Sequence, residues 1–467
     1  MGCPTIAPAE CDDPSSDWYQ YVTSKELIAE PNLHLSGENP SQVGPGFYEL
    51  YEQDLDLTQR ELKNNGLRLG LEWSRLFPTA TDGVEGYDNL KKRANPKALA
   101  FYHKLLAALK ARGMKPLVTV HHYVLPLWIH DGVACHKDIV NCKNRGWVDR
   151  ARIVKELSKF AGFVGREFGA EVDLWATLNE PFTAVILPGY LFQTPDRTNP
   201  PAVFLKTAEA KTAMVAMIEA HARMYDALQA ADTVDVDGDG RASRIGVVYN
   251  LQATAPDDPD SALDRRGVKN LEYLMNELFL NAVAKGDLDA QLDGKVVHRD
   301  DLAKRMDYLG INYYSRAVAQ GTAESVFPQI SPLLTIDLLN LKLKSDPKGL
   351  YEVLLWAKAK YNLPIFVTET GAAPLKPEEE PQREAWVVGT LSWIHQAIAD
   401  GVPVEGYYYW SLMDNYEWNH GMGLRFGLLA VDPGKAKART VREAGRTYGQ
   451  IAAGGEISVA LQGRFPR

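Results

Sequence analysis

The chain has 467 residues, of which 45% are hydrophobic and 24% are charged, so it can bury a large core without crosslinks. Its formal net charge of −9 argues against nucleic acid or an anionic membrane as a partner. No apolar run approaches the length of a membrane span, and the first residues lack the pattern of a secretion signal, so we expect a cytoplasmic protein.

The predicted elements alternate along most of the chain. Residues 1–46 are expected to be mostly loop, with a short or truncated first strand near residues 3–7. From there on, stretches with helical spacing of apolar residues alternate with short apolar runs typical of buried strands. The predicted helices cover residues 47–65, 96–112, 149–168, 202–231, 261–285, 300–305, 349–360, 382–400 and 440–453. The predicted strands cover residues 67–73, 116–122, 172–180, 245–250, 308–314, 364–370 and 404–410.

This alternation predicts the fold class. Strands that alternate with helices imply a parallel sheet. Seven clear units and a weak first strand favour an α/β fold of the (β/α)8 TIM-barrel type, with residues 1–467 as a single domain. Nucleotide-binding folds lose support, because no glycine-rich phosphate loop follows the first strand.

Several predicted strands end in polar or aromatic residues. One apolar run closes with Asn179 and Glu180 before a proline, and another closes with Glu369. Because the carboxyl ends of barrel strands meet at one mouth, we expect these two carboxylates to lie in one site. Other such residues at strand ends are Arg68, His121, His122, Tyr313, Tyr314, Trp410, Glu417 and Trp418.

Each of these residues alone has an ordinary structural explanation, but the set fits a neutral polyhydroxyl ligand better than a metal or a phosphate. Glycoside cleavage needs one carboxyl group that protonates the departing oxygen and a second that attacks the anomeric carbon or activates water. Indole rings offer a flat face to sugar C–H groups, while amides, imidazoles and carboxylates bind hydroxyls. We therefore expect a small glycoside or oligosaccharide as the substrate.

The segments around these residues also carry specific motifs. They are Glu72-Trp73-Ser74-Arg75-Leu76-Phe77-Pro78, Thr177-Leu178-Asn179-Glu180-Pro181, Asn312-Tyr313-Tyr314, Thr368-Glu369-Thr370-Gly371 and Trp410-Ser411-Leu412-Met413-Asp414-Asn415-Tyr416-Glu417-Trp418. Together they resemble the signatures of glycoside hydrolase family 1, from about residue 16 to about residue 448. The Ser16-Asp17-Trp18 opening is most similar to the archaeal-type β-glycosidases.

The resemblance implies a retaining exo-β-glycosidase of the β-glucosidase or β-galactosidase kind that needs no cofactor. It implies that Glu180 is the acid/base, that Glu369 is the nucleophile, and that Arg68 and Tyr314 support the nucleophile. The residues implied to bind the sugar are His122, Asn179, Trp410, Glu417 and Trp418. The Glu417 carboxylate would repel a phosphate, which favours a non-phosphorylated sugar. A transglycosidase and a non-hydrolytic sugar-binding protein are the alternatives.

The first strand departs from the family pattern. The family carries a sugar-binding Gln there, followed two residues later by Glu, whereas the corresponding stretch Thr5-Ile6-Ala7-Pro8-Ala9-Glu10-Cys11 has no Gln. We expect either a misassigned start or a short first strand. The sequence therefore leaves the preference for glucose, galactose, fucose or mannose open, together with the natural aglycone and the oligomeric state.

Two further patterns lie outside the predicted site. Residues 235–241 match the front of a calcium-binding EF-hand loop, with Asp235, Asp237 and Asp239 as ligands, but the twelfth position is Gly246 rather than Glu. A structural calcium site and an acidic turn are the two interpretations. The four cysteines show no C-x-x-C spacing. We expect free thiols, with a local disulfide or a metal site at Cys135 and Cys142 as alternatives.

Overall fold

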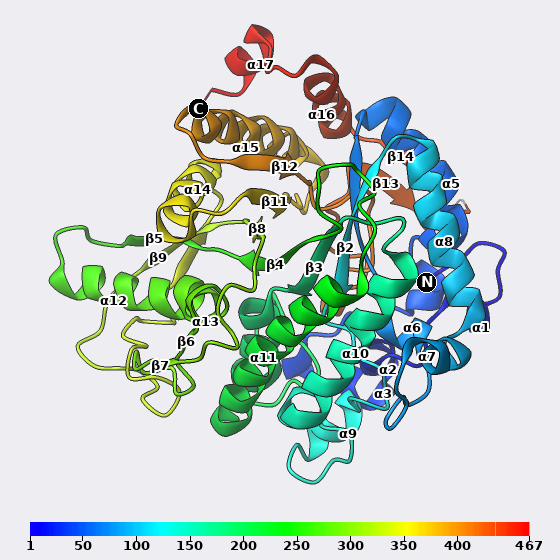
Figure 1. The fold of residues 1–467 in the computed structure, drawn as a ribbon. Helices are drawn as coiled ribbons and strands as arrows, with labels where there is room; N and C mark the ends of the chain where they lie inside the picture. Colours follow the sequence, from blue (N-terminus) through cyan, green and yellow to red (C-terminus); the bar gives the residue numbers. More distant parts are fainter. Residues whose placement is uncertain (435, 467) are drawn as a thin grey trace.

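The computed structural model describes residues 1–434 and 436–466, and its centre is a seven-stranded parallel sheet (Figure 1). The strands are β1 (Gly66–Gly70), β2 (Lys115–His121), β3 (Leu174–Asn179), β4 (Arg244–Asn250), β8 (Tyr308–Asn312), β11 (Ile365–Glu369) and β12 (Val404–Tyr407). They are hydrogen-bonded in the order β1-β2-β3-β4-β8-β11-β12. Helices surround the curled sheet, so the predicted (β/α)8 barrel architecture is confirmed.

Except for α5, which precedes β1, the helices around the barrel follow the strands in the chain. They are α5 (Phe47–Leu57), α8 (Pro96–Ala111), α10 (Arg150–Phe168), α11 (Thr207–Ala231), α12 (Ala262–Glu272), α13 (Leu278–Lys285), α14 (Pro347–Tyr361), α15 (Pro381–Ala399) and α16 (Glu443–Gly454). Among them, α10 shows how sequence sets packing. Ile153, Leu157, Phe160 and Val164 recur at helical spacing and are buried. Gly165 allows α11 to approach, because an added Cβ would lie 3.2 Å from the Leu228 side chain.

The chain also contains shorter elements outside the seven-stranded sheet and its main helices. The short helices are α1 (Pro8–Cys11), α2 (Asp17–Thr23), α3 (Lys25–Ile28), α4 (Pro40–Val43), α6 (Trp73–Leu76), α7 (Tyr87–Arg93), α9 (Gly132–Lys137) and α17 (Val459–Arg464). The 3-10 and π segments are η1 (Pro31–Leu33), η2 (Thr58–Leu62), η3 (Gly146–Val148), η4 (Pro181–Leu191), η5 (Tyr273–Glu277), η6 (Pro377–Glu379) and η7 (Trp418–His420). The remaining strands are β5 (Ala253–Pro256), β6 (Asp287–Leu288), β7 (Val297–His298), β9 (Arg316–Ala319), β10 (Lys342–Lys344), β13 (Leu429–Asp432) and β14 (Ala438–Val441).

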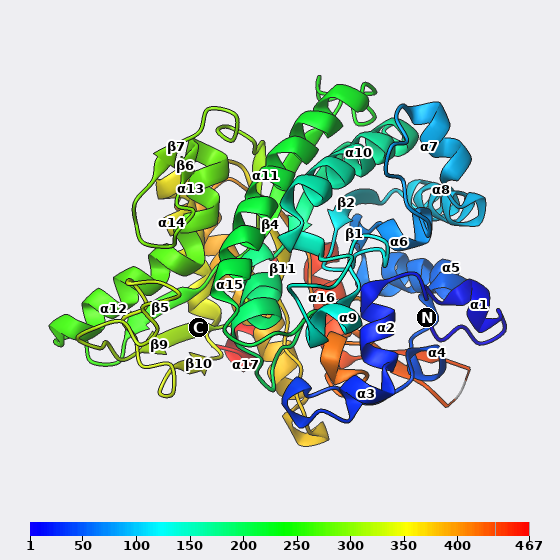
Figure 2. The ribbon, with the colours of Figure 1, turned by 90° about the horizontal axis from the view of Figure 1, so that it is seen from below.

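The first 46 residues differ from the prediction. The strand expected near residues 3–7 is wrong, because that stretch bends and leads into α1, and residues 1–46 contain no strand. Figure 2 shows these residues as short helices at one end of the barrel, with α2 beside α9. The Asp17 carboxylate attaches α2 to the segment after β2. It accepts the backbone N–H of Leu125 at 2.9 Å and pairs with His130. The segment therefore packs around the barrel mouth instead of joining the sheet.

Three further expectations need correction. The helix expected at residues 300–305 is a series of turns, and the helix expected from residue 202 begins at Thr207. The expectation of free thiols is wrong, because Cys3 is bonded to Cys11 and Cys135 to Cys142. Both pairs are local in sequence. The bond between Cys135 and Cys142 is the alternative that had been left open, whereas a bond between Cys3 and Cys11 was not predicted.

Disulfides are rare in the cytoplasm, so these two bonds count against the expected cytoplasmic location, which stays a prediction. Within residues 1–434 and 436–466, no helix is long and apolar enough to cross a membrane.

Candidate active site

The two carboxylates predicted to pair lie at the carboxyl ends of β3 and β11. Glu369 is the last residue of β11 and stands opposite Asn312 of β8 in the sheet register. Glu180 follows β3 directly with a φ of 43°, in the left-handed region where a residue with a side chain is strained. Both carboxylates are buried, Glu180 being 5% and Glu369 4% exposed. Strain and a buried charge at one barrel mouth indicate a functional site.

Glu180 receives three hydrogen bonds from residues on neighbouring strands. Its Oε2 accepts the Tyr123 hydroxyl at 2.5 Å. Its Oε1 accepts the amides of Asn250 at 3.0 Å and Asn312 at 2.8 Å. The donors come from the ends of β4 and β8 and from the residues after β2. Three neighbouring segments of the sheet therefore fix this carboxylate in one orientation.

Glu369 is held by a cation and a hydroxyl. Arg68 Nη1 donates to its Oε1 at 2.5 Å, and the Tyr314 hydroxyl donates to its Oε2 at 2.8 Å. Burial raises the pKa of Glu369 to about 7, while Arg68 and Tyr314 act in the opposite direction and the nearby Glu180 charge adds to the rise. The carboxylate is thus poised to change its charge near neutral pH.

A continuous chain of hydrogen bonds joins the two carboxylates. Arg68, already bonded to Glu369, donates through Nη2 to Asn179 Oδ1 at 2.6 Å. Asn179 Nδ2 in turn donates to the Tyr123 hydroxyl oxygen at 2.7 Å. Since that oxygen accepts from Asn179, the Tyr123 proton is left to point at Glu180. The orientation of each carboxylate is therefore coupled to that of the other through three intervening side chains.

Aromatic rings and a third carboxylate form the adjoining wall. The His122 ring lies 5.9 Å from Trp410 and 5.6 Å from Trp418, nearly parallel to both. Glu417 Oε2 accepts the Trp410 indole N–H at 3.3 Å and the Asn415 amide at 3.1 Å, and burial raises the pKa of Glu417. Burial, together with the charge of Arg68, holds the pKa of His122 well below its usual range, so this ring is neutral. Flat rings beside buried acceptors and a neutral imidazole can bind a sugar ring and its hydroxyls.

The structure brings together all nine residues predicted for the site, and it adds others that sequence reasoning did not assign. The additions are Tyr123, Asn250, Asn312 and Arg197. Asn250 and Asn312 each end a strand, the same signal that had identified Glu369. Arg197 carried no such signal. Its guanidinium lies 5.5 Å from the Tyr123 ring centroid and 5.7 Å from that of Trp418, and reaches the site from a loop after η4.

The acidic loop of residues 235–241 lies apart from this mouth, directly before the amino end of β4. Carboxylate oxygens of Asp173, Asp235 and Asp237 lie within 4.8 Å of one another, while Asp239 is outside this group. The Asp235 carboxylate accepts the backbone N–H groups of Gly238 and Gly240, and Lys115 Nζ lies 3.0 Å from Asp237. These hydrogen bonds and this ion pair are the contacts expected of an acidic turn.

Comparisons with known proteins cover nearly the whole chain. The model of the family described as Glycosyl hydrolase family 1 matches residues 23–456. A β-galactosidase of Pyrococcus woesei is 33% identical over 90% of this chain and 88% of its own. The 6-phospho-β-glucosidase GmuD of Bacillus subtilis is 28% identical over 91% of this chain and 90% of its own. The solved structure of the β-glycosidase from Thermosphaera aggregans has a TM-score of 0.81 at 28% identity, covering 97% of this chain and 94% of that chain.

Proposed function

Since the chain belongs to glycosyl hydrolase family 1, as its motifs predicted, we propose that it is a retaining exo-β-glycosidase in which Glu369 is the nucleophile and Glu180 the acid/base. Its substrates are small, non-phosphorylated glycosides with a terminal β-linked sugar. The observation that carries this proposal is the pair of buried carboxylates at the ends of β3 and β11, each with its own set of donors.

The reaction proceeds in two displacements. In the first, the ionised Glu369 attacks the anomeric carbon while Glu180 gives its proton to the departing glycosidic oxygen, which leaves as an alcohol. In the second, Glu180 takes a proton from water, whose oxygen attacks the same carbon and frees Glu369. Arg68 and Tyr314 support the first role, because both donate to Glu369 and so favour its ionised form. Both steps use only side chains of this chain, so hydrolysis needs no cofactor.

The proposed sugar site is the wall beside the carboxylates. Trp410 and Trp418 offer their faces to the ring, and His122, Asn179 and Glu417 bind hydroxyls. Glu417 also bears on substrate choice, since a relative is described as a 6-phospho-β-glucosidase. A phosphate beside the buried Glu417 carboxylate would meet like charge in a desolvated setting, which disfavours phosphorylated sugars.

Replacement of Glu369 by Gly tests the assignment. We expect kcat/KM for an aryl β-glycoside to fall by roughly 10⁶-fold, the scale of losing a nucleophile. The space left at the anomeric carbon should admit azide, which attacks in place of the nucleophile, restores turnover and, because a single displacement inverts the configuration, yields the α-glycosyl azide. Glu369→Gln, which leaves no such space, is the matched control and should stay inactive in azide. Hydrolysis at the original rate in Glu369→Gly would overturn the proposal.

A substrate panel tests the second part of the proposal. Aryl β-glucoside, β-galactoside, β-fucoside and β-mannoside are compared with an aryl 6-phospho-β-glucoside. We expect turnover of at least one neutral glycoside and little turnover of the phosphorylated one. In Glu417→Gln the preference against phosphate should weaken, because the repelling charge is gone. A wild-type preference for the phosphorylated substrate would contradict the role given to Glu417.

A further inference from the structure

Tyr123 lies in a strained turn that meets the proposed acid/base. Its φ is 69°, and the Val124 N–H donates to the His122 carbonyl at 2.9 Å, so Tyr123 is the central residue of a γ-turn of the rare, strained kind. Glu180, which accepts the Tyr123 hydroxyl at 2.5 Å, also has a left-handed φ of 43°. Two strained residues that are both buried and in direct contact indicate that the contact serves the reaction.

The amide partners of Glu180 can donate to it but cannot accept its proton. Asn250 and Asn312 both give N–H groups to Oε1, at 3.0 and 2.8 Å. The Asn250 amide is fixed in this orientation because its oxygen accepts from Gln252 at 2.7 Å. The Asn312 amide is fixed because its oxygen accepts the Thr368 hydroxyl at 2.8 Å. Both acceptor sites of Oε1 are therefore occupied, and a proton placed there would displace one of these donors.

The other oxygen of Glu180, Oε2, has one acceptor site left. Within residues 1–434 and 436–466, Tyr123 is the one residue that donates to it. A carboxylate oxygen has about two lone-pair sites, so a single site on Oε2 remains for the proton that an acid must carry. The proton of Glu180 therefore has one favoured place, on the oxygen that Tyr123 contacts.

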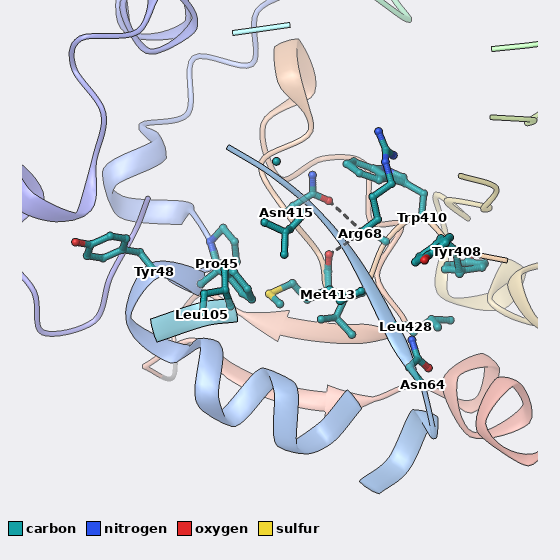
Figure 3. A pocket seen from close by; sticks show the side chains of 18 of the residues that line it. Pro45, Tyr48, Asn64, Arg68, Leu105, Tyr408, Trp410, Met413, Asn415 and Leu428 are labelled. Atoms are coloured by element: carbon teal, nitrogen blue, oxygen red, sulfur yellow. Dashed lines mark hydrogen bonds between the residues drawn. The ribbon is translucent and has the colours of Figure 1, made fainter. Parts of the chain in front are cut away.

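The neighbours of Tyr123 direct its hydroxyl proton at Glu180. Asn179 Nδ2 donates to the hydroxyl oxygen at 2.7 Å, which occupies the side of the oxygen away from Glu180. Arg68 Nη2 fixes the Asn179 amide by donating to its Oδ1 at 2.6 Å. Figure 3 shows Arg68, the first residue of this chain of donors, directed away from Met413 of the cavity beside β1. The chain thus extends from β1 into the site and ends at Oε2.

The groups that face Tyr123 keep the phenol protonated. Burial raises the pKa of Tyr123 well above its usual value, and the charges of Glu180 and Glu369 add to the rise. The Arg197 guanidinium, 5.5 Å from the ring centroid, acts in the opposite direction. The His122 ring, 4.6 Å away, is neutral because burial lowers its pKa. Tyr123 is therefore a lasting hydrogen-bond donor and does not itself give up a proton.

We propose that Tyr123 is a positioning residue that makes Oε2 of Glu180 the oxygen that gives up the catalytic proton, and that stabilises the charge left on it. The inference rests on the proposed function, in which Glu180 is the acid/base. In the first displacement a bond forms from Glu369 to the anomeric carbon and the bond to the glycosidic oxygen breaks. The electron pair of the broken bond stays on that oxygen, which takes the proton from Oε2. As Oε2 becomes negative, the hydrogen bond from Tyr123 strengthens.

Tyr123→Phe tests the proposal with two leaving groups. The change removes one oxygen and keeps the ring that packs 4.7 Å from Trp418. For a phenyl β-glycoside, whose departing oxygen needs the proton, we expect kcat/KM to fall by about 10–100-fold, the range for losing a hydrogen bond to a charged group. For the dinitrophenyl β-glycoside of the same sugar, whose leaving group departs without a proton, we expect a fall of less than about threefold. Equal losses with the two substrates would overturn the proposal.

Tyr314→Phe is the matched control, because it removes the same hydroxyl from the other carboxylate, Glu369. Its loss should be equal for the two substrates, since the nucleophile must attack whichever group departs. A second comparison places Tyr123→Phe in a Glu180→Gln background and uses the phenyl substrate. There we expect a further fall of less than about twofold, because no acid remains for the hydroxyl to support. A full loss in that background would show that Tyr123 acts independently of Glu180 and would overturn the proposal.

A measurement without turnover separates this inference from the proposed function. The carboxyl band of Glu180 is identified in infrared difference spectra by its loss in Glu180→Gln. In Tyr123→Phe this band should change from carboxyl to carboxylate at a higher pH than in the unaltered protein, because the ionised form has lost a donor. Failure of the unaltered protein to hydrolyse any β-glycoside would overturn the proposed function and this role with it. Hydrolysis together with an unchanged Glu180 band in Tyr123→Phe would overturn the role of Tyr123 alone.

Discussion

Two parts of the parallel sheet differ in how far their strands are buried. We call β2, β3, β4, β8 and β11, each paired on both sides, the closed side of the barrel, and β1 and β12, each paired on one side only, the open side. β2, β3, β4, β8 and β11 are buried over nearly all of their length, and Leu117, Ala176 and Val248 there are fully buried. Every residue of β1 is partly exposed, although Leu67 and Leu69 are as apolar as the residues of β2. The difference follows from pairing, because a strand is covered along its edges only by neighbours on both sides. Burial of these strands is therefore set by their place in the sheet as much as by their composition.

The candidate site joins the two sides. Glu180 and Glu369 end strands of the closed side, and the donors to Glu180 come from that side too. The cation beside Glu369, however, is Arg68 of β1, and Trp410 continues β12. This β-glycosidase thus relies on the open side for the charge that holds its proposed nucleophile.

Arg68→Ala should have the largest effect and tests whether the open side matters for catalysis. Its side chain and that of Glu369 are 7% and 6% exposed, and removing one partner of such a buried pair costs about 3–5 kcal/mol. We expect kcat/KM to fall by about 10²–10³-fold. Arg68→Lys keeps the charge but cannot donate to Glu369 and Asn179 through a planar fork, so an intermediate loss is expected. A loss of only a few-fold in Arg68→Ala would show that the closed side suffices.

A pair of core substitutions measures the difference in burial directly. Leu117→Ala in β2 removes a fully buried side chain that packs in one cluster with Ala176 and Val248. It should lower the free energy of unfolding by about 3 kcal/mol. Leu67→Ala in β1 removes a partly exposed side chain and should cost about 1 kcal/mol. Urea unfolding of both variants makes the comparison, and equal costs would mean that β1 is as well covered as β2.

Tyr314→Phe tests the contribution of the closed side to the charge of Glu369. Because burial raises the pKa of Glu369 to about 7 and the nucleophile must be ionised, kcat/KM of the unaltered enzyme should fall as the pH drops below about 7. The Tyr314 hydroxyl favours the ionised form, so its loss raises that pKa and moves the acid limb to higher pH. At pH 6 we expect kcat/KM to fall by about tenfold relative to the unaltered enzyme. An acid limb that stays in place would exclude this role for the hydroxyl.

The smallest effect is expected at the amino ends of the strands, where the acidic loop lies. Hydrolysis by side chains alone predicts that EDTA leaves both kcat/KM and the melting temperature unchanged. Asp237→Asn, which removes one carboxylate of the cluster, should behave like the unaltered protein with and without added calcium. If calcium raises the melting temperature of the unaltered protein but not of Asp237→Asn, the loop holds a structural ion.

Sequence patterns predicted those residues of the site that can be recognised from their immediate neighbours in the chain. Glu369 closes an apolar run, and Asn179 and Glu180 close another, so a reader of the sequence can place them at one barrel mouth. Tyr123 was not assigned, because nothing within a few residues of it indicates that its hydroxyl reaches Glu180. The disulfide between Cys3 and Cys11 was missed for a related reason. Its formation depends on how residues 1–11 bend, which composition does not specify.

The sequence by itself determined the alternation of strands and helices, the carboxylates at the ends of β3 and β11, and the family. These features depend on residues that are neighbours in the chain, where spacing and propensity act. Only the tertiary structure decided which donors surround Glu180, how Arg68 and Asn179 join the two carboxylates, and where the barrel stays open. Those features depend on contacts between strands far apart in sequence, such as β1 and β12, whose separation is set by the closure of the whole sheet.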